Sequence, residues 1–160
     1  MRRILISGFF VLSLLSITVS LALATSPHFV SARDSVNSDG ALVITWREAG
    51  LGNNVTVEYT ASADATAVWG CVNRGGNHPN ASNKETVAGP VSGGGIFDSG
   101  RNGTINGSLT VGPLLAPGTL SCPGKMRLVL VSVTYTNVTL TDTTNDLSVT
   151  FPDVTRVFFS

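Results

Sequence analysis

The chain has 160 residues, of which 12% are charged and 42% are hydrophobic, and its formal net charge is zero. This length suits a single domain, and the composition is too apolar and too weakly charged for a disordered protein. Two of the ten basic residues, Arg2 and Arg3, stand at the N-terminus, so the remainder has eight basic and ten acidic residues. A chain without a basic surplus is poorly suited to nucleic acid, which we exclude as a partner.

The N-terminal segment has the features of a secretory signal peptide. Arg2 and Arg3 precede an uncharged run from Ile4 to Ala24, and small residues suited to signal peptidase end at Ala24 and again at Ala32. We expect cleavage after Ala24 or Ala32, which makes the protein extracellular and leaves it without a membrane attachment. The alternative is an uncleaved anchor, since about 21 apolar residues can cross a bilayer. The serines within the run favour cleavage.

The chain is expected to have three parts. Residues 1–32 are signal peptide and leader, and residues 33–40 are polar and aperiodic, which predicts a flexible lead-in. Residues 41–160 form a single domain, in which apolar and polar residues alternate in short stretches typical of half-buried β-strands. No stretch after the leader has a helical period. The expected strands cover residues 42–46, 55–63, 67–71, 85–98, 104–111, 126–140 and 146–151.

About seven short strands predict an all-β domain, most simply a two-sheet antiparallel sandwich with an immunoglobulin-like arrangement. A small closed β-barrel is the alternative. The glycines at residues 93–95 predict a bulge or bend within the fourth strand. The Asn102-Gly103 pair predicts a tight hairpin between the fourth and fifth strands, because both central residues of such a turn need a positive φ.

Cys71 and Cys122 are the only cysteines, so a single disulfide can form, and an even number favours pairing in an oxidising compartment. Two thiols without a nearby histidine cannot complete a tetrahedral zinc site. Cys122 lies in a segment rich in proline and glycine, unlike an immunoglobulin cysteine. We expect the bridge to join the end of the third strand to the loop before the sixth. The alternative is two buried free thiols.

Candidate catalytic residues are few. His28 lies in the leader or next to it, which leaves His78 as the one histidine of the domain, and no Gly-x-Ser-x-Gly motif occurs. A carboxylate-pair hydrolase would need two acidic groups in one cleft. No spacing favours any two of the acidic residues considered, which are Glu48, Glu58, Asp64, Glu85 and Asp98. We therefore expect no catalytic residues and no cofactor.

Two oxygen-rich turns match a calcium loop only in part. The first runs from Ser35 to Gly40, but it begins with serine and lacks the acidic residue that closes such a loop. The second contains Asp142, Asn145 and Asp146, which are weak calcium candidates. Asn and Asp often cap their own backbone in turns without a metal. We therefore expect no bound metal.

The most distinctive polar stretch is the loop of residues 72–84, which Cys71 anchors at one end. Loops of about a dozen residues in small domains are often functional, and polar side chains on rigid ends suit a recognition surface. The alternative is an ordered connector whose asparagines satisfy its own backbone. The candidate recognition residues are Arg74, Asn77, His78, Asn80, Asn83 and Lys84.

Residues 65–145 resemble a group of small uncharacterised secreted proteins of filamentous, Streptomyces-like bacteria. The residues that carry the resemblance are Cys71-Val72-Asn73, Gly75-Gly76, Pro79, Ala81, Asn83-Lys84, Gly89-Pro90-Val91, Phe97, Asn102-Gly103, Ser121-Cys122-Pro123-Gly124 and Val133-Thr134-Tyr135-Thr136-Asn137-Val138. The resemblance implies an exported bacterial protein with a Cys71–Cys122 bridge. It implies no activity.

These features together predict a secreted, non-catalytic β-sandwich that binds an extracellular protein, a glycan or a cell-wall component. The expected contact is the loop of residues 72–84. Two other functions remain open: a secreted enzyme inhibitor or antimicrobial factor, and, less favoured, the carboxylate-pair hydrolase.

Overall fold

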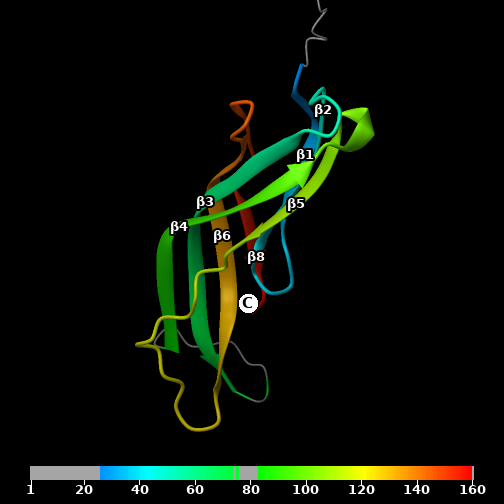
Figure 1. Cartoon of the computed structure of the whole chain (residues 1–160). Helices are drawn as coiled ribbons and strands as arrows, with labels where there is room; N and C mark the ends of the chain where they lie inside the picture. Colours follow the sequence, from blue (N-terminus) through cyan, green and yellow to red (C-terminus); the bar gives the residue numbers. More distant parts are fainter. Residues whose placement is uncertain (1–25, 74, 76–82, 160) are drawn as a thin grey trace, which may run out of the picture.

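The computed structural model describes residues 26–73, 75 and 83–159, and its strands form two antiparallel sheets packed face to face (Figure 1). The predicted sandwich is confirmed, and neither sheet closes into a barrel. No helix among these residues has both the length and the apolar character needed to cross a membrane. The strands are β1 (His28–Val36), β2 (Leu42–Ala49), β3 (Thr56–Val72), β4 (Lys84–Asp98), β5 (Ile105–Val111), β6 (Arg127–Asp142), β7 (Leu147–Thr150) and β8 (Val154–Val157).

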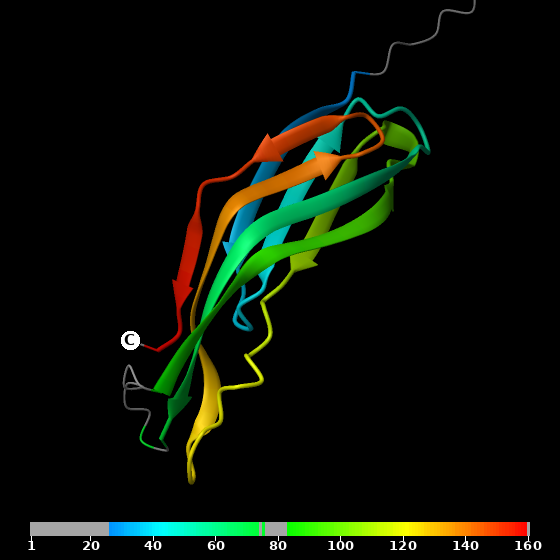
Figure 2. The ribbon, with the colours of Figure 1, turned by 90° about the vertical axis from the view of Figure 1, so that its left-hand side faces the viewer.

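The two sheets differ in length. The short sheet has the strand order β1-β2-β5, with strands of 9, 8 and 7 residues. The long sheet has the order β4-β3-β6-β7, and β8 also pairs with β6, which has 16 residues beside the 17 of β3. The short sheet therefore covers only one half of the long sheet, and the other half extends beyond it (Figure 2).

The covered half contains the main core. Strict alternation along β3 turns Val57, Tyr59 and Ala61 inward, and all three are fully buried. The ring of Trp46, from β2, lies 4.6 Å from that of Tyr59 and 5.1 Å from that of Phe97 between ring centroids. Each such aromatic pair adds about 0.5–1.5 kcal/mol beyond the area that it buries.

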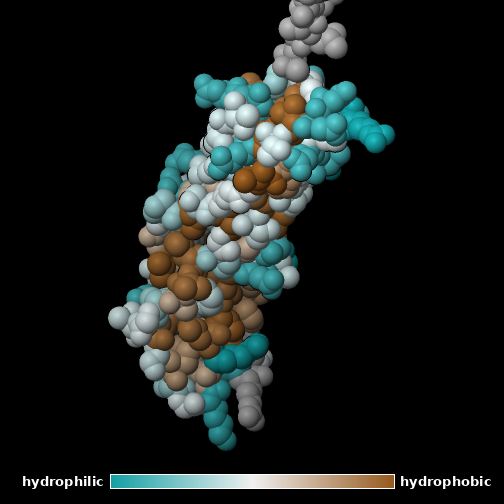
Figure 3. Space-filling view, viewed as in Figure 1, coloured by the Kyte–Doolittle hydropathy of each residue, from teal (hydrophilic) through white to brown (hydrophobic). Residues whose placement is uncertain are grey.

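The open half of the long sheet comprises Ala65–Val72 of β3 and the segments of β4 and β6 that pair with it. It has no second sheet over it. Residues 112–126, which connect β5 to β6, cross this half, and hydrophobic residues gather at the surface there (Figure 3). Leu115 is 85% exposed, and a Cβ placed on Gly89 of β4 would meet no atom within 4 Å.

The structure corrects the expectation for the segment before residue 41. His28–Val36 is strand β1, which pairs with β2 along its length, so residues 33–36 are not a flexible lead-in. The sequence concealed this strand because a bulge between Phe29 and Ser31 interrupts the alternation. In addition, Asp34 takes a position on the inward face where an apolar residue would be expected.

Four smaller expectations also change. The second and third expected strands form the single strand β3, and β8 is an additional strand. Together with β1, these changes bring the seven expected strands to eight among the described residues. Residues 93–95 pair with β3 without a register shift, so of the two predicted features, a bulge or a bend, the bulge is wrong. Gly103 has the expected positive φ of 65°, but β4 and β5 belong to different sheets. The Asn102-Gly103 segment is therefore a crossing between sheets and not a hairpin.

Candidate functional site

The predicted recognition loop lies largely outside the described residues. The candidates that fall outside them are Arg74, Asn77, His78 and Asn80. Of the remaining candidates, Asn83 is half-buried, and Lys84 is exposed at the start of β4. The role of this loop therefore stays a prediction.

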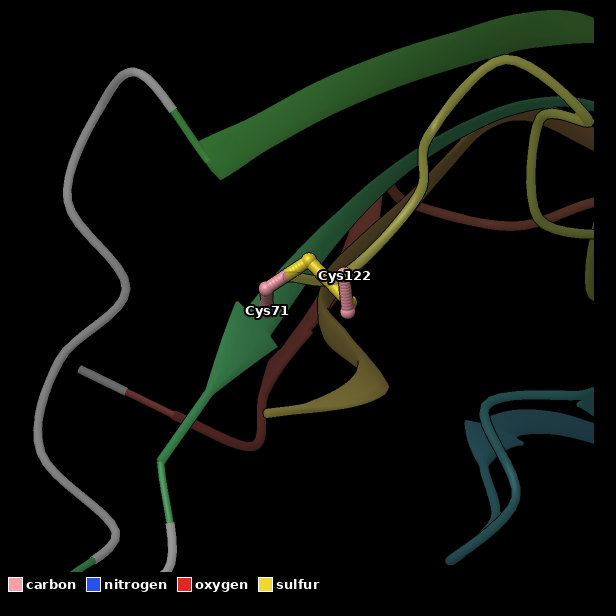
Figure 4. The surroundings of a disulfide bond; sticks show 2 residues. All are labelled: Cys71 and Cys122. Atoms are coloured by element: carbon pink, nitrogen blue, oxygen red, sulfur yellow. A yellow bond between two sulfur atoms is a disulfide. The ribbon is translucent and has the colours of Figure 1, made fainter. Parts of the chain in front are cut away.

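The disulfide next to that loop is confirmed. Cys71 and Cys122 are bonded with an S–S distance of 2.07 Å and a Cα–Cα distance of 5.4 Å (Figure 4). As predicted, the bond joins the end of β3 to the loop before β6. It lies in the open half and fastens the 112–126 segment to the long sheet.

The weak calcium candidates belong to the turn between β6 and β7. Oδ1 of Asp142 accepts hydrogen bonds from the backbone N–H of Thr144 (2.8 Å) and Asn145 (2.9 Å), and Oδ2 accepts one from the side chain of Asn145 (2.6 Å). Asp146 is exposed, with a positive φ of 58°. The carboxylate thus caps its own turn. The described residues contain no group of three or more His, Cys, Asp or Glu placed to hold a metal ion.

Two carboxyl groups do meet, but they meet inside the core. Glu48 of β2 and Asp142 of β6 are both fully buried, and Asp142 lies near enough to Glu48 to raise the pKa of its carboxyl group. Oε2 of Glu48 accepts a hydrogen bond of 2.9 Å from the hydroxyl of Tyr59. Neither group lines either of the two surface depressions described below. A hydrolase needs its acidic groups in contact with substrate, so this pair is placed to support the fold.

Burial raises the pKa of Glu48 to about 7, and the neighbouring Asp142 adds to this rise. The hydrogen bond from Tyr59 and the charge of His28 act in the opposite direction. Oε1 of Glu48 accepts no hydrogen bond. That oxygen can therefore carry the proton of the carboxyl group. Burial also raises the pKa of Tyr59, so its hydroxyl remains a donor.

The candidate site is the outward face of the short sheet, where the register aligns polar side chains in three rows. We call this surface the polar grid. Eight of its nine positions carry Ser, Thr, Asn or Arg, all of them exposed, and the ninth is the half-buried Val43. The rows, each running across β1, β2 and β5, are Ser31–Arg47–Asn106, Arg33–Thr45–Ser108 and Ser35–Val43–Thr110.

The polar grid is open and weakly hollowed. A depression of about 320 Å³ lies between its first two rows and is lined by Ser31, Arg33, Thr45, Trp46, Arg47 and Asn106, of which Trp46 is buried. No acidic or aromatic side chain occupies any of the nine positions. The surface therefore offers many hydrogen-bond donors and two positive charges on a rigid sheet, an arrangement that can bind a ligand but lacks an acid or base for catalysis.

A second depression, of about 390 Å³, lies over β3, β4 and β6 on the long sheet, beside the bulge at Asn137. Its charged member is Asp64, whose Oδ2 accepts a hydrogen bond of 2.8 Å from the side-chain amide of Asn137. Asn137 has a positive φ of 52°. This interaction supports the bulge, so we regard the second depression as the lesser candidate.

The polar grid could not be predicted without β1, because β1 carries three of its nine positions and was not among the expected strands. Ser31, Arg33 and Ser35 alternate with Ala32 and Asp34, and this short alternation was the available signal. No protein-family model matches the chain, and no curated protein is significantly similar to it.

Proposed function

We propose that this protein is a secreted, non-catalytic binding module that attaches to extracellular material through the polar grid. The observation that carries the proposal is the grid itself, which combines eight exposed polar side chains on a rigid three-stranded scaffold. Binding residues held on strands are positioned more accurately than residues on loops. The loop of residues 72–84 is a second, untested contact.

Export is supported by the N-terminal pattern and by the disulfide, a bond that persists in oxidising compartments. Of the two expected cleavage points, Ala24 precedes β1, whereas Ala32 lies within it and pairs with Trp46. Cleavage after Ala24 keeps the three residues of β1 that belong to the polar grid, whereas cleavage after Ala32 removes Ser31. We therefore favour Ala24, which N-terminal sequencing of the secreted protein would test.

The proposal is tested by retention of the secreted, disulfide-bonded protein on cell-envelope and culture fractions. The variant T45V/S108V removes two hydroxyls of the grid and keeps both arginines. We expect its affinity to fall by about tenfold or more, since each hydrogen bond contributes about 1 kcal/mol. The matched control is T66V/T86V, which makes the same kind of change at exposed positions of the long sheet. Absence of retention of the unaltered protein on every fraction would refute the proposal.

A further inference from the structure

We propose that the ligand of the polar grid is an anionic glycopolymer, a hydroxylated chain outside the cell that carries repeated phosphate or carboxylate groups. Arg33 and Arg47 would bind two of those groups. This inference rests on the proposed function and names the ligand class of the same site.

The charges of the polar grid are uncompensated. Arg33 and Arg47 are both exposed, and neither forms an ion pair with any described residue. The acidic residues nearest to them in sequence, Asp34 and Glu48, lie on strand positions that face inward. The outward face is therefore positive, although the protein without its leader has a slight excess of acidic residues. A local field of this kind selects an anionic partner.

The register sets the spacing of the two arginines. Ser31 is opposite Arg47, and Arg33 is opposite Thr45, so the arginines are diagonal neighbours on adjacent strands. The Cα atoms of such neighbours are about 7–8 Å apart. A guanidinium group binds phosphate or carboxylate through two parallel hydrogen bonds. Thr45, Asn106 and Ser31 surround the arginines with further donors, which suit the oxygens of an anion and the hydroxyls of a polymer backbone.

The openness of the site indicates a polymer and not a small anion. An exposed ion pair contributes little to affinity, so a single phosphate would be held weakly on this flat surface. Repeated groups on one chain raise the affinity, because each binding event increases the effective concentration of the next group. None of the nine grid positions is aromatic. Trp46 borders the depression, but it is only 4% exposed and its ring packs against Tyr59 and Phe97 in the core. The grid therefore lacks the exposed stacking platform that a nucleic-acid strand would use and that the apolar face of a neutral sugar would use.

The test measures binding of the disulfide-bonded secreted protein to poly(glycerol phosphate), polygalacturonate, neutral dextran and single-stranded DNA. We expect binding to one or both anionic polymers and none to dextran. The two anionic polymers distinguish phosphate from carboxylate as the source of the charge. Because two charges are neutralised, the affinity should fall at least about tenfold between about 20 and 200 mM salt. The variant R33Q/R47Q should weaken binding at least about tenfold.

The control R101Q/R127Q removes the same net charge from exposed positions outside the grid and should bind within about twofold of the unaltered protein, because distant exposed charges are screened. Equal binding of R33Q/R47Q and R101Q/R127Q, or stronger binding to DNA or dextran than to the anionic polymers, would overturn the inference. If R33Q/R47Q binds normally while T45V/S108V loses retention on envelope fractions, the inference fails and the proposed function stands. If neither double variant changes retention, both fail.

Discussion

The covered and open halves of the long sheet are built from different side chains. Under the short sheet, the core contains the large rings of Trp46, Tyr59 and Phe97. In the open half, β3 turns the small residues Ala65 and Ala67 to the inside, and the large side chain of Tyr135, which pairs with Ala65 at its edge, is contributed by β6. The long sheet is continuous through both halves, so the difference follows from what covers it.

The two halves show two ways of covering the inner face of one sheet. Where a second sheet is present, burial of apolar area stabilises the fold, and this half tolerates the buried Glu48–Asp142 pair. Where the second sheet ends, the large apolar residues Leu115 and Leu128 remain exposed. There the disulfide fastens an irregular segment over the sheet. We therefore expect the two halves to respond differently to the same kinds of change.

Loss of the disulfide should have the largest effect. The bond joins residues separated by 51 positions, and loop closure of this length corresponds to about 4 kcal/mol in the free energy of unfolding. The variant C71S/C122S should lower the midpoint of urea unfolding accordingly. The two tryptophans report on the halves separately, because Trp46 lies in the covered half and Trp69 in the open half.

Single-tryptophan forms would report the unfolding of each half by fluorescence. W69F retains Trp46 in the covered half, and W46F retains Trp69 in the open half. We expect the Trp69 signal of C71S/C122S to change at lower urea than the Trp46 signal, because the disulfide lies beside Trp69. Reduction of the unaltered protein is the control and should give the same order. Coincident transitions at an unchanged midpoint would contradict the division into two halves.

The buried carboxyl pair makes the covered half sensitive to pH. The pKa of Glu48 is about 7 in the folded protein, compared with 4.5 for the free group, so the folded state binds the proton more tightly. The stabilisation is therefore fully present below about pH 4.5 and is lost as the pH rises through 7. This shift corresponds to about 3 kcal/mol. Glu48→Gln keeps the hydrogen-bonding groups but not the ionisation.

We expect Glu48→Gln to match the unaltered protein near pH 4.5 and to be more stable above pH 7, by up to about 3 kcal/mol. Urea unfolding measured from pH 4.5 to pH 8.5 would show this difference. Glu58→Gln, at an exposed position of β3, is the matched control and should leave the pH profile unchanged. A pH profile of Glu48→Gln that parallels the unaltered protein would show that Glu48 does not hold the proton.

Sequence alternation was sufficient to predict the all-β class, β5 and β6, because these strands have a regular apolar face. The disulfide was predicted separately, from the two cysteines that the chain contains. It was insufficient where tertiary contacts override the pattern. The inward Asp34 and the bulge beside Phe29 concealed β1, and with it half of the arginine pair in the polar grid. The Glu48–Asp142 pair depends on the register that places Asp142 beside Tyr59. No pattern in the local sequence predicts that register.

Two glycines on inward faces give the smallest and most direct comparison of the halves. Gly107 of β5 pairs with Trp46, and a Cβ at this position would overlap the indole ring. The space beside Gly89 of β4, at the start of the open half, is empty. Gly107→Ala should therefore destabilise the protein by about 1–3 kcal/mol through overpacking. Gly89→Ala should stabilise it by about 0.5–1 kcal/mol, because alanine loses less conformational freedom on folding.

Thermal unfolding of both variants under identical conditions would measure the difference, and neither glycine has the positive φ that would strain alanine. The same change from glycine to alanine is thus expected to lower the free energy of unfolding at residue 107 and to raise it at residue 89. The single reason is that a ring opposes residue 107 and none opposes residue 89. If Gly89→Ala is as destabilising as Gly107→Ala, the inner face at residue 89 must be packed against another surface in solution. The open half would then be a covered one.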